Sequence, residues 1–249
     1  MNWTKRIPIM LAGIAFLLLF WECAARAFGS SLLLPGIMPT LKWFIDLLLT
    51  RRFYTAVWGS FLRVLAGIAL AVPLGIISGI VAGLDKRALA FLRPLFSVIS
   101  ATPVISVILI AFLILGDTRT PVFTAFLMIF PVISANVIEG INSTDAKLRE
   151  LFVSFRMSRK ESIHYLYIPT LAPFILGALN SSLSLCWKVV VAAEVIVQPA
   201  RSLGLGMQRA RAMLETPELF AWTGATIIAA ALSQGLLLLI ARLCKRAGP

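Results

Sequence analysis

The stretch from Asp145 to Pro173 reads DAKLRELFVSFRMSRKESIHYLYIPTLAP, and it is the longest polar run in an otherwise mostly apolar sequence. Apolar segments of membrane-spanning length lie on both sides of it. A stretch with this many charges cannot lie in hydrocarbon, because charged side chains are costly there. We therefore predict that it projects into water on one side of a membrane, where its length indicates a binding partner.

The composition is typical of an integral membrane protein. Of the 249 residues, 59% are hydrophobic and 14% are charged, whereas soluble domains average about 25% charged residues. The net charge of +12 would suit nucleic-acid binding, but no basic face interleaved with aromatic residues is present. The positive charges instead cluster at the ends of apolar runs, as topology requires. We expect a lipid bilayer around the chain and no nucleic acid as a partner.

Six apolar segments reach the length of about 20 residues that a membrane-spanning helix needs. They cover approximately residues 7–27, 54–85, 91–115, 121–141, 171–197 and 219–243. The first resembles a secretory signal with a possible cleavage site at Ala25-Arg26-Ala27, and we expect it to remain as an uncleaved span. The predicted fold is an all-α membrane protein with about six transmembrane helices.

Shorter elements and interruptions are predicted between these spans. Residues 38–50 read as an amphipathic helix at the membrane interface, because they are too few and too polar to span. Ala101-Thr102-Pro103 interrupts the third span, since proline removes a hydrogen bond from the helix. Residues 116–119 read as a turn. A loop with Gly204 and Gly206 leads to a short helix over residues 207–214.

The distribution of Lys and Arg predicts the orientation, because cytoplasmic loops carry an excess of positive residues. One side of the predicted bundle collects Lys5, Arg6, Lys86, Arg87, Arg93, Lys147, Arg149, Arg156, Arg159, Lys160, Arg242, Lys245 and Arg246. The other side collects Arg26, Lys42, Arg51, Arg52, Arg119, Arg201, Arg209 and Arg211. The larger set marks the cytoplasmic side, so both termini and the polar stretch are predicted to lie there.

A stripe of small residues follows one face of the second span. Its members recur at every fourth position and are Gly67, Ala71, Gly75, Gly79 and Gly83. Such spacing lets another helix backbone approach closely. We interpret the stripe as a surface for helix packing rather than as a groove that faces a substrate.

Several motifs resemble those of bacterial ABC-importer permeases. In the polar stretch they look like the cytoplasmic EAA loop of those proteins, and they comprise Glu150-Leu151-Phe152, Ser158-Arg159, Ile168-Pro169-Thr170-Leu171-Ala172-Pro173 and Gly177. Elsewhere they comprise Leu34-Pro35-Gly36 with Pro39, Ser60 to Gly67, Trp187 to Glu194 and Gly204-Leu205-Gly206. Over roughly residues 32–243 the chain is similar to the nitrate/sulfonate/taurine branch of the binding-protein-dependent type I permeases.

This resemblance implies the MetI-like fold of type I permeases and a division of the chain. Residues 1–31 would form the first transmembrane helix and the start of an external loop, and residues 32–52 the rest of that loop with the interfacial helix. Residues 53–243 would form the transmembrane core, and residues 244–249 a cytoplasmic tail. Within the core, residues 142–170 would be the cytoplasmic EAA loop, called the polar segment below.

The polar segment departs from the family pattern at two positions. The family motif has small residues after the glutamate and a glycine six positions beyond it, whereas this chain has Phe152 and Arg156 there. A glycine would allow a left-handed turn, a conformation that costs an arginine about 1 kcal/mol. Either the bend has a different geometry, or Arg156 contacts the partner.

The resemblance also implies a transport subunit without catalytic chemistry of its own. The sequence has no GxxxxGK[ST] motif, the glycine-rich loop that cradles ATP phosphates. We therefore expect no cofactor or metal on this chain, and ATP and Mg²⁺ on two separate cytoplasmic ATPase subunits. The residues implied to contact those subunits are Glu150, Leu151, Phe152, Phe155, Arg156, Met157, Ser158, Arg159 and Pro169.

Other partners follow from the same resemblance. A homodimer would place the translocation pathway at its two-fold interface, and an extracytoplasmic solute-binding protein would deliver the solute. The implied location is the bacterial cytoplasmic membrane. Positive residues near the pathway fit an anion such as a sulfonate, taurine or nitrate, but the sequence does not identify the solute.

Ionisable residues inside the predicted spans are candidates for the pathway, because such groups are rare at membrane depth. They are Arg63 in the second span and Lys188 and Glu194 in the fifth. Lys188 and Glu194 lie about 120° apart on a helix, so they do not pair with each other. We expect Glu194, which shares a helix face with Trp187, to meet a cation from another helix, either Arg63 or Lys188 of a neighbour. A structural ion pair and a substrate contact both remain open.

Ser181, Ser182 and Ser184 give the fifth span a polar edge, for which hydrogen bonding between helices is the alternative to a pathway role. Two other classes of protein compete with the permease. An intramembrane enzyme would carry a motif such as HExxH or GxSxG, and none is present. A secondary transporter would be longer and would contain an internal repeat.

Overall fold

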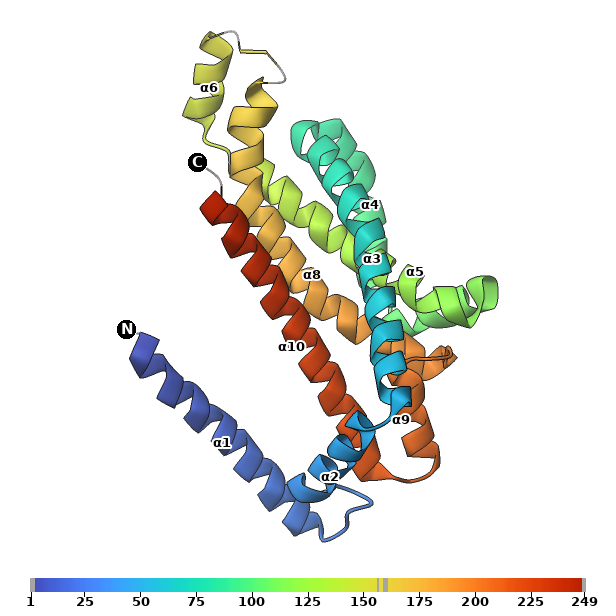
Figure 1. The fold of residues 1–249 in the computed structure, drawn as a ribbon. Coiled ribbons are helices and arrows are strands. Elements are labelled where there is room, and N and C mark those ends of the chain that lie inside the picture. The colour runs from blue at the N-terminus through green and yellow to red at the C-terminus, as the bar shows by residue number, and fades with distance from the viewer. Residues whose placement is uncertain (1–2, 156, 159–160, 248–249) are drawn as a thin grey trace.

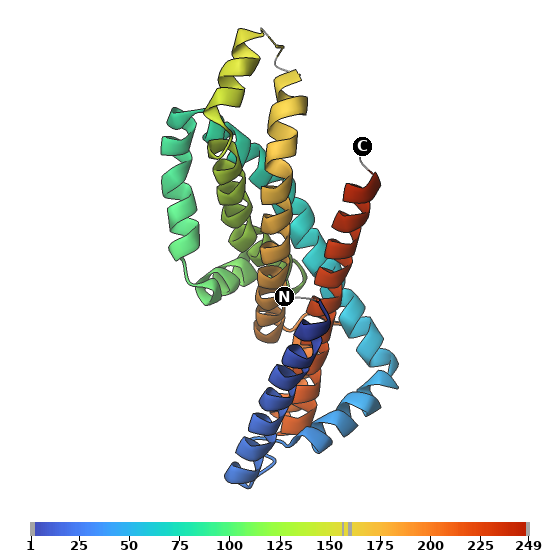
Figure 2. The same cartoon turned by 90° about the vertical axis from the view of Figure 1, so that its left-hand side faces the viewer.

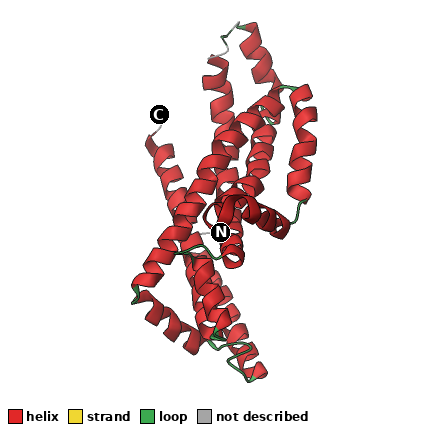
Figure 3. Ribbon diagram, turned by 90° about the vertical axis from the view of Figure 1, so that its right-hand side faces the viewer, coloured by secondary structure: helices red, strands yellow, loops and turns green. Residues whose placement is uncertain are grey.

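The computed structural model describes residues 3–155, 157–158 and 161–247. These residues contain no β-strand, as Figure 3 shows, so the prediction of an all-α protein is confirmed. In chain order the helices are α1 (Trp3–Phe28), α2 (Ile37–Leu48), α3 (Arg51–Leu84), α4 (Lys86–Ala101), α5 (Val104–Asn142), α6 (Ala146–Ser154), η1 (Ser162–Tyr167), α8 (Ile168–Val197), α9 (Leu203–Ala212) and α10 (Thr216–Ala247). Figure 1 shows that α1 diverges from the bundle formed by the other long helices.

Five helical stretches of the described chain are long and apolar enough to cross a membrane. They are Pro8–Phe28, Arg51–Leu84, Val104–Asn142, Tyr165–Val197 and Thr216–Leu243. These correspond to the predicted first, second, fifth and sixth spans, while the predicted fourth span is the second part of Val104–Asn142. The predicted count of about six spans is not confirmed, because the region of the third span is built differently.

A third span over residues 91–115 with an interruption at Ala101-Thr102-Pro103 was predicted. The structure has this interruption, but it divides the segment between two helices rather than interrupting one span. α4 ends after 16 residues, and Thr102 and Pro103 then leave helical geometry with ψ angles of 127° and 129°. The cause is local, because a residue that precedes proline is disfavoured in the α conformation. A second corner follows at Gly116, whose φ is 73° and ψ is −175°. Residues 104–115 therefore form a short arm that turns away from α4, as Figures 1 and 2 show.

The stripe of small residues lies on α3 where this helix faces α5. Its glycines meet α5 in register: Gly67 lies against Ala125, Gly75 against Ile133, Gly79 against Val137 and Gly83 against Ile141. The remaining member, Ala71, is completely buried. Because the stripe lacks large side chains, the two helices approach closely. Ser78 and Ser134 add a hydrogen bond of 2.8 Å between the same two helices.

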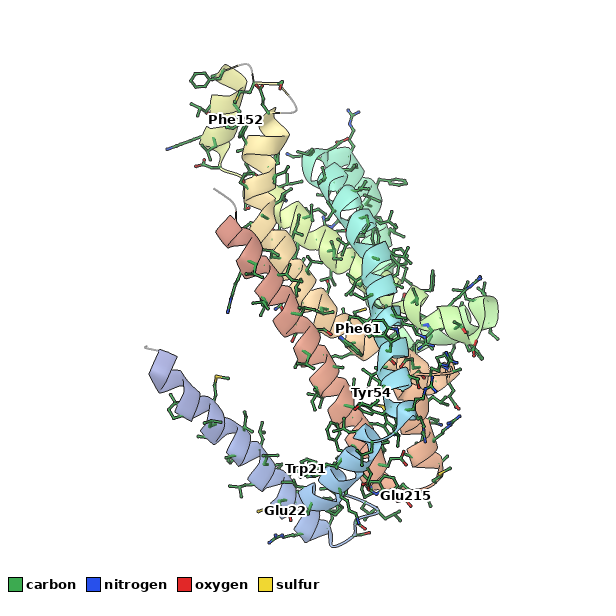
Figure 4. The ribbon with its side chains drawn as sticks, viewed as in Figure 1. Trp21, Glu22, Tyr54, Phe61, Phe152 and Glu215 are labelled. Carbon is green, nitrogen blue, oxygen red and sulfur yellow. The ribbon has the colours of Figure 1, made fainter. Side chains whose placement is uncertain are left out.

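The end of α1 anchors it to the rest of the molecule. The indole Nε1 of Trp21 donates to the carbonyl of Pro35 at 3.0 Å, and the ring stacks on Phe220 of α10 with 5.8 Å between the ring centroids. Glu22 accepts a hydrogen bond of 3.0 Å from the N–H of Ile37, the first residue of α2. Figure 4 labels Trp21 and Glu22 at this end. α2 coincides with the short helix that was predicted for the membrane interface.

α9 begins at Leu203 rather than at residue 207, so the prediction that Gly204 and Gly206 lie in a loop is wrong. The hydroxyl of Ser202 accepts a hydrogen bond of 3.1 Å from the N–H of Leu205 and so caps the helix at this earlier point. The glycines serve packing instead. A Cβ at Gly206 would lie 2.6 Å from the ring of Trp222 in α10.

We predict that Gly79→Ala destabilises the bundle, because the new Cβ would lie 2.6 Å from the Cβ of Val137. Overpacking of this kind typically costs about 1–3 kcal/mol. Thermal unfolding of the purified protein in detergent measures the effect. Gly224→Ala on α10 is the matched control, since its Cβ would meet no atom within 4 Å. Equal melting temperatures for the two variants would contradict the predicted close contact.

Candidate functional site

The polar segment forms a helical elbow that projects beyond one end of the bundle. α6 follows α5 after a short turn, in which the carboxylate of Asp145 accepts a hydrogen bond of 2.9 Å from the N–H of Lys147. Figure 4 shows Phe152 on α6, at the opposite end of the molecule from Trp21, Glu22 and Glu215. The elbow therefore lies outside the region where the long helices pack against one another.

The elbow exposes large apolar side chains. The exposed fraction is 48% for Leu151, 73% for Phe155 and 37% for Met157. Glu150 is exposed and Phe152 is half-buried. Of the other residues implied to contact an ATPase, Pro169 lies in the first turn of α8, and Arg156 and Arg159 fall outside the described residues.

Ser158 has a structural function that our sequence analysis missed. Its N–H donates to the carboxylate of Glu161 at 2.7 Å, and its hydroxyl accepts a hydrogen bond of 3.3 Å from the N–H of Glu161. This reciprocal pair is a capping box, which the S-x-x-E spacing signals in the sequence. Hydrogen bonds from the side chain and the backbone of Ser158 lower the pKa of Glu161 below its ordinary value. The pair fixes the start of the helical run that continues through η1 into α8.

A second group of polar residues is buried near the far end of α8. Glu194 has no exposed surface. The hydroxyl of Ser60 lies 2.8 and 2.7 Å from its two carboxylate oxygens, and Nη1 of Arg63 lies 3.1 Å from Oε1. The N–H of Gly204 donates to Oε2 at 3.2 Å. We call Ser60, Arg63, Glu194, Leu203 and Gly204 the Glu194 cluster.

The Glu194 cluster also holds the connection between α8 and α9. Arg63 donates to the carbonyl of Ala200 at 3.0 Å and to that of Arg201 at 3.2 Å. The N–H of Leu203 donates to the hydroxyl of Ser60 at 3.0 Å. The arginine therefore satisfies one carboxylate and two carbonyls at once, which its planar, multi-donor fork allows and a lysine would not.

Two glycines allow the close packing of this region. A Cβ at Gly59 would lie 2.0 Å from the carbonyl oxygen of Arg201, and a Cβ at Gly204 would lie 2.4 Å from the Cβ of Glu194. The carboxylate is thus surrounded by protein donors from two other elements. Since a buried charge needs such pairing, the geometry accounts for Glu194 without a bound solute.

The structure thus brings Glu194 together with Arg63 of the second span. Lys188 is exposed on α8 and is not part of the cluster. Ser60 was not among the candidate residues of the sequence analysis. The available signal was its spacing, because Ser60 and Arg63 are three residues apart and share a helix face, as donors to one buried carboxylate must.

The remaining candidates in the fifth span make contacts within the bundle. Trp187 is 1% exposed and lies in the hydrophobic core. The hydroxyl of Ser184 accepts a short hydrogen bond from Nε2 of Gln234 in α10. Within the described part of the chain, the hydroxyl of Ser181 bonds only to carbonyls of its own helix. A role of these residues in the pathway stays a prediction.

A cavity of about 460 Å³ lies between α3 and the corner of α5. Its walls are apolar and include Leu62, Leu115 and Phe123, and Arg63 and Arg119 are among the residues that line it. Arg119 was placed by the sequence analysis only in the outer group of positive residues. The corner at Gly116 brings it to the same cavity as Arg63.

We predict that Glu194→Ala strongly destabilises the protein, because it leaves the Arg63 guanidinium, 13% exposed, without its anionic partner. Breaking a buried ion pair from one side costs about 3–5 kcal/mol. The double variant Arg63→Leu/Glu194→Ala should lose less than the sum of the single variants Arg63→Leu and Glu194→Ala, and unfolding in denaturant measures each. Glu139→Ala, which removes an exposed carboxylate of α5, serves as the control. Additive losses would exclude an energetic link between Arg63 and Glu194.

We predict that Ser158→Ala frays the start of the run into α8 and speeds amide hydrogen exchange of residues 161–165 about fivefold, as the loss of a helix cap typically does. Ser154→Ala removes a hydroxyl that, among the described residues, bonds to the carbonyl of Glu150 alone, and it should leave these amides unchanged. Because the folded pKa of Glu161 is lowered, its stabilising effect is present above the unfolded pKa and is lost as the pH falls through the folded pKa. Equal exchange at neutral and acidic pH, after correction for the intrinsic rate, would argue against the capping box.

Comparison with known proteins places this geometry in a family. A family model described as "Binding-protein-dependent transport system inner membrane component" matches residues 71–247. Formylaminopyrimidine transport permease protein ThiX of Halalkalibacterium halodurans is 27% identical to this chain over 80% of the chain and 78% of its own length. Putative aliphatic sulfonates transport permease protein SsuC of Bacillus subtilis is 27% identical over 77% of this chain and 70% of its own. Taurine transport system permease protein TauC of Escherichia coli is 26% identical over 96% and 90%.

The matched region contains the polar segment, α8 and its buried carboxylate, and the last part of α3 from Ala71 onward. Members of this family are transport components of the membrane rather than enzymes. The multi-pass helical architecture agrees with that assignment. The chain therefore belongs to the family of inner-membrane components of binding-protein-dependent transport systems, the permeases of ABC importers.

Proposed function

We propose that this chain is the transmembrane subunit of an ATP-driven importer and that it works as a homodimer. Two copies would enclose the translocation pathway, two cytoplasmic ATPase subunits would carry ATP and Mg²⁺, and a solute-binding protein would deliver the solute from outside. The chain would lie in the bacterial cytoplasmic membrane with both termini and the polar segment in the cytoplasm. The family supports the class of transporter.

The observation that carries this proposal is the exposed elbow of the polar segment. Leu151, Phe155 and Met157 are apolar and exposed although they belong to a segment that is too polar for hydrocarbon. Exposed apolar side chains on a short, capped element are typical of a docking surface. The proposed occupant of this surface is the cytoplasmic ATPase subunit of the importer.

The proposed solute is a small anion that also has an apolar part. The cavity between α3 and α5 has apolar walls, and Arg63 and Arg119 are among the residues that line it. Arg63 already has Glu194 as a counterion, so Arg119 contributes the net charge. Relatives named for aliphatic sulfonates and taurine support this chemistry, whereas the relative named for formylaminopyrimidine shows that similarity alone does not choose the solute.

We predict that Phe155→Asp abolishes binding of the ATPase without unfolding the permease, because its side chain is 73% exposed and would be desolvated only in the complex. The measurement is co-purification of the cognate ATPase with the detergent-extracted permease. Met213→Asp is the control, since Met213 is 71% exposed between α9 and α10, at the other end of the molecule. Undiminished ATPase recovery with Phe155→Asp would refute the proposed docking surface.

A further inference from the structure

α8 connects the polar segment to the Glu194 cluster. The helix has 30 residues and is therefore about 45 Å long. Its first residue follows η1 directly, so the polar segment continues into it. Glu194 lies in its last turn. A displacement of the polar segment that moves α8 as a rigid rod would therefore move Glu194 as well.

The Glu194 cluster links the end of α8 to two neighbouring helices by direct hydrogen bonds. Glu194 is bonded to α3 through Ser60 and Arg63 and to the start of α9 through Gly204. The short connection that follows α8 contains two non-glycine residues with positive φ, Gln198 at 51° and Arg201 at 54°. Such conformations persist only where the surroundings hold them.

Arg63 and Ser60 of α3 add hydrogen bonds to this connection beside its own local bonds from Gln198 N–H to the carbonyl of Glu194 and from the Ser202 hydroxyl to the carbonyl of Pro199. Arg63 binds the carbonyls of Ala200 and Arg201, and Ser60 accepts the N–H of Leu203. The same two side chains bind Glu194. The position of the connection is thus tied to the position of the carboxylate, and one cannot shift without the other unless several of these hydrogen bonds break.

We infer that Ser60 and Arg63 are positioning residues that make the connection and α9 move together with the end of α8. The cluster would then carry ATP-driven movement of the polar segment to the outer face of the permease. This inference rests on the proposed function. In this inference Arg63 and Glu194 transmit movement between helices and do not contact the solute directly.

The test uses the complete importer, with both ATPases and the binding protein, reconstituted in liposomes. Arg63→Lys keeps the charge but loses the fork that holds both carbonyls, and Ser60→Ala is a milder second variant. We expect both to hydrolyse ATP while the number of solute molecules transported per ATP falls about fivefold or more, within the usual range of coupling between sites. Thr55→Ala on the same helix is the control, because the Thr55 hydroxyl bonds to the carbonyl of Arg52 and to no other residue that the structure describes.

A distance measurement separates coupling from a merely structural role. Spin labels at Leu84 and Ile168 report on the inner end, and labels at Tyr54 and Arg211 report on the outer end; all four side chains are exposed. In the variants, ATP should still change the inner distance but no longer the outer one. If both distances change as in the unsubstituted protein, or if transport falls only in proportion to ATP hydrolysis, the inference is overturned. If the unsubstituted importer shows no ATP-driven transport, the proposed function itself fails.

Discussion

The pairing of one buried carboxylate determines how three elements of this protein meet. Glu194 has no contact with water, so its charge requires donors from the protein. They come from two residues of α3 and from the backbone at the start of α9. The close approach of Gly59 and Gly204 follows from the same requirement, because larger residues would keep these donors away. The position of α9 is therefore a consequence of the charge on α8.

The contact between α3 and α5 depends on close packing of small residues rather than on a buried charge. α3 meets α5 through residues that nearly lack side chains, and the contact extends from Gly67 to Gly83. In a membrane the hydrophobic effect does not drive helices together, so close packing and hydrogen bonds must do so. α3 thus has a polar attachment to α8 near its start and, along its remaining length, an attachment to α5 that is apolar except for the Ser78–Ser134 hydrogen bond. One helix consequently sets the positions of both of its neighbours.

Much of this architecture was readable from the sequence, because apolar length and residue spacing are local signals. The polar segment, the helical class, the stripe on α3 and most spans follow from them. The full break after α4 and the early start of α9 did not, although Pro103 and Ser202 contribute to them locally. Both depend on which surface the next helix finds, as with Gly206 against Trp222. Ser60 was missed because its partner Glu194 lies 134 residues away in the chain.

The corner at Gly116 has a consequence for how this sequence can vary. Its φ of 73° and ψ of −175° belong to a region that essentially only glycine occupies. No atom lies within 4 Å of the place that a Cβ would take, so crowding does not impose the glycine; the torsion angles of the backbone do. Within the arm of residues 104–115, by contrast, packing constrains the buried residues Val107, Ile108 and Ala111. The angle between this arm and the rest of α5, and with it the place of Arg119 beside α3, therefore depends on a glycine at position 116.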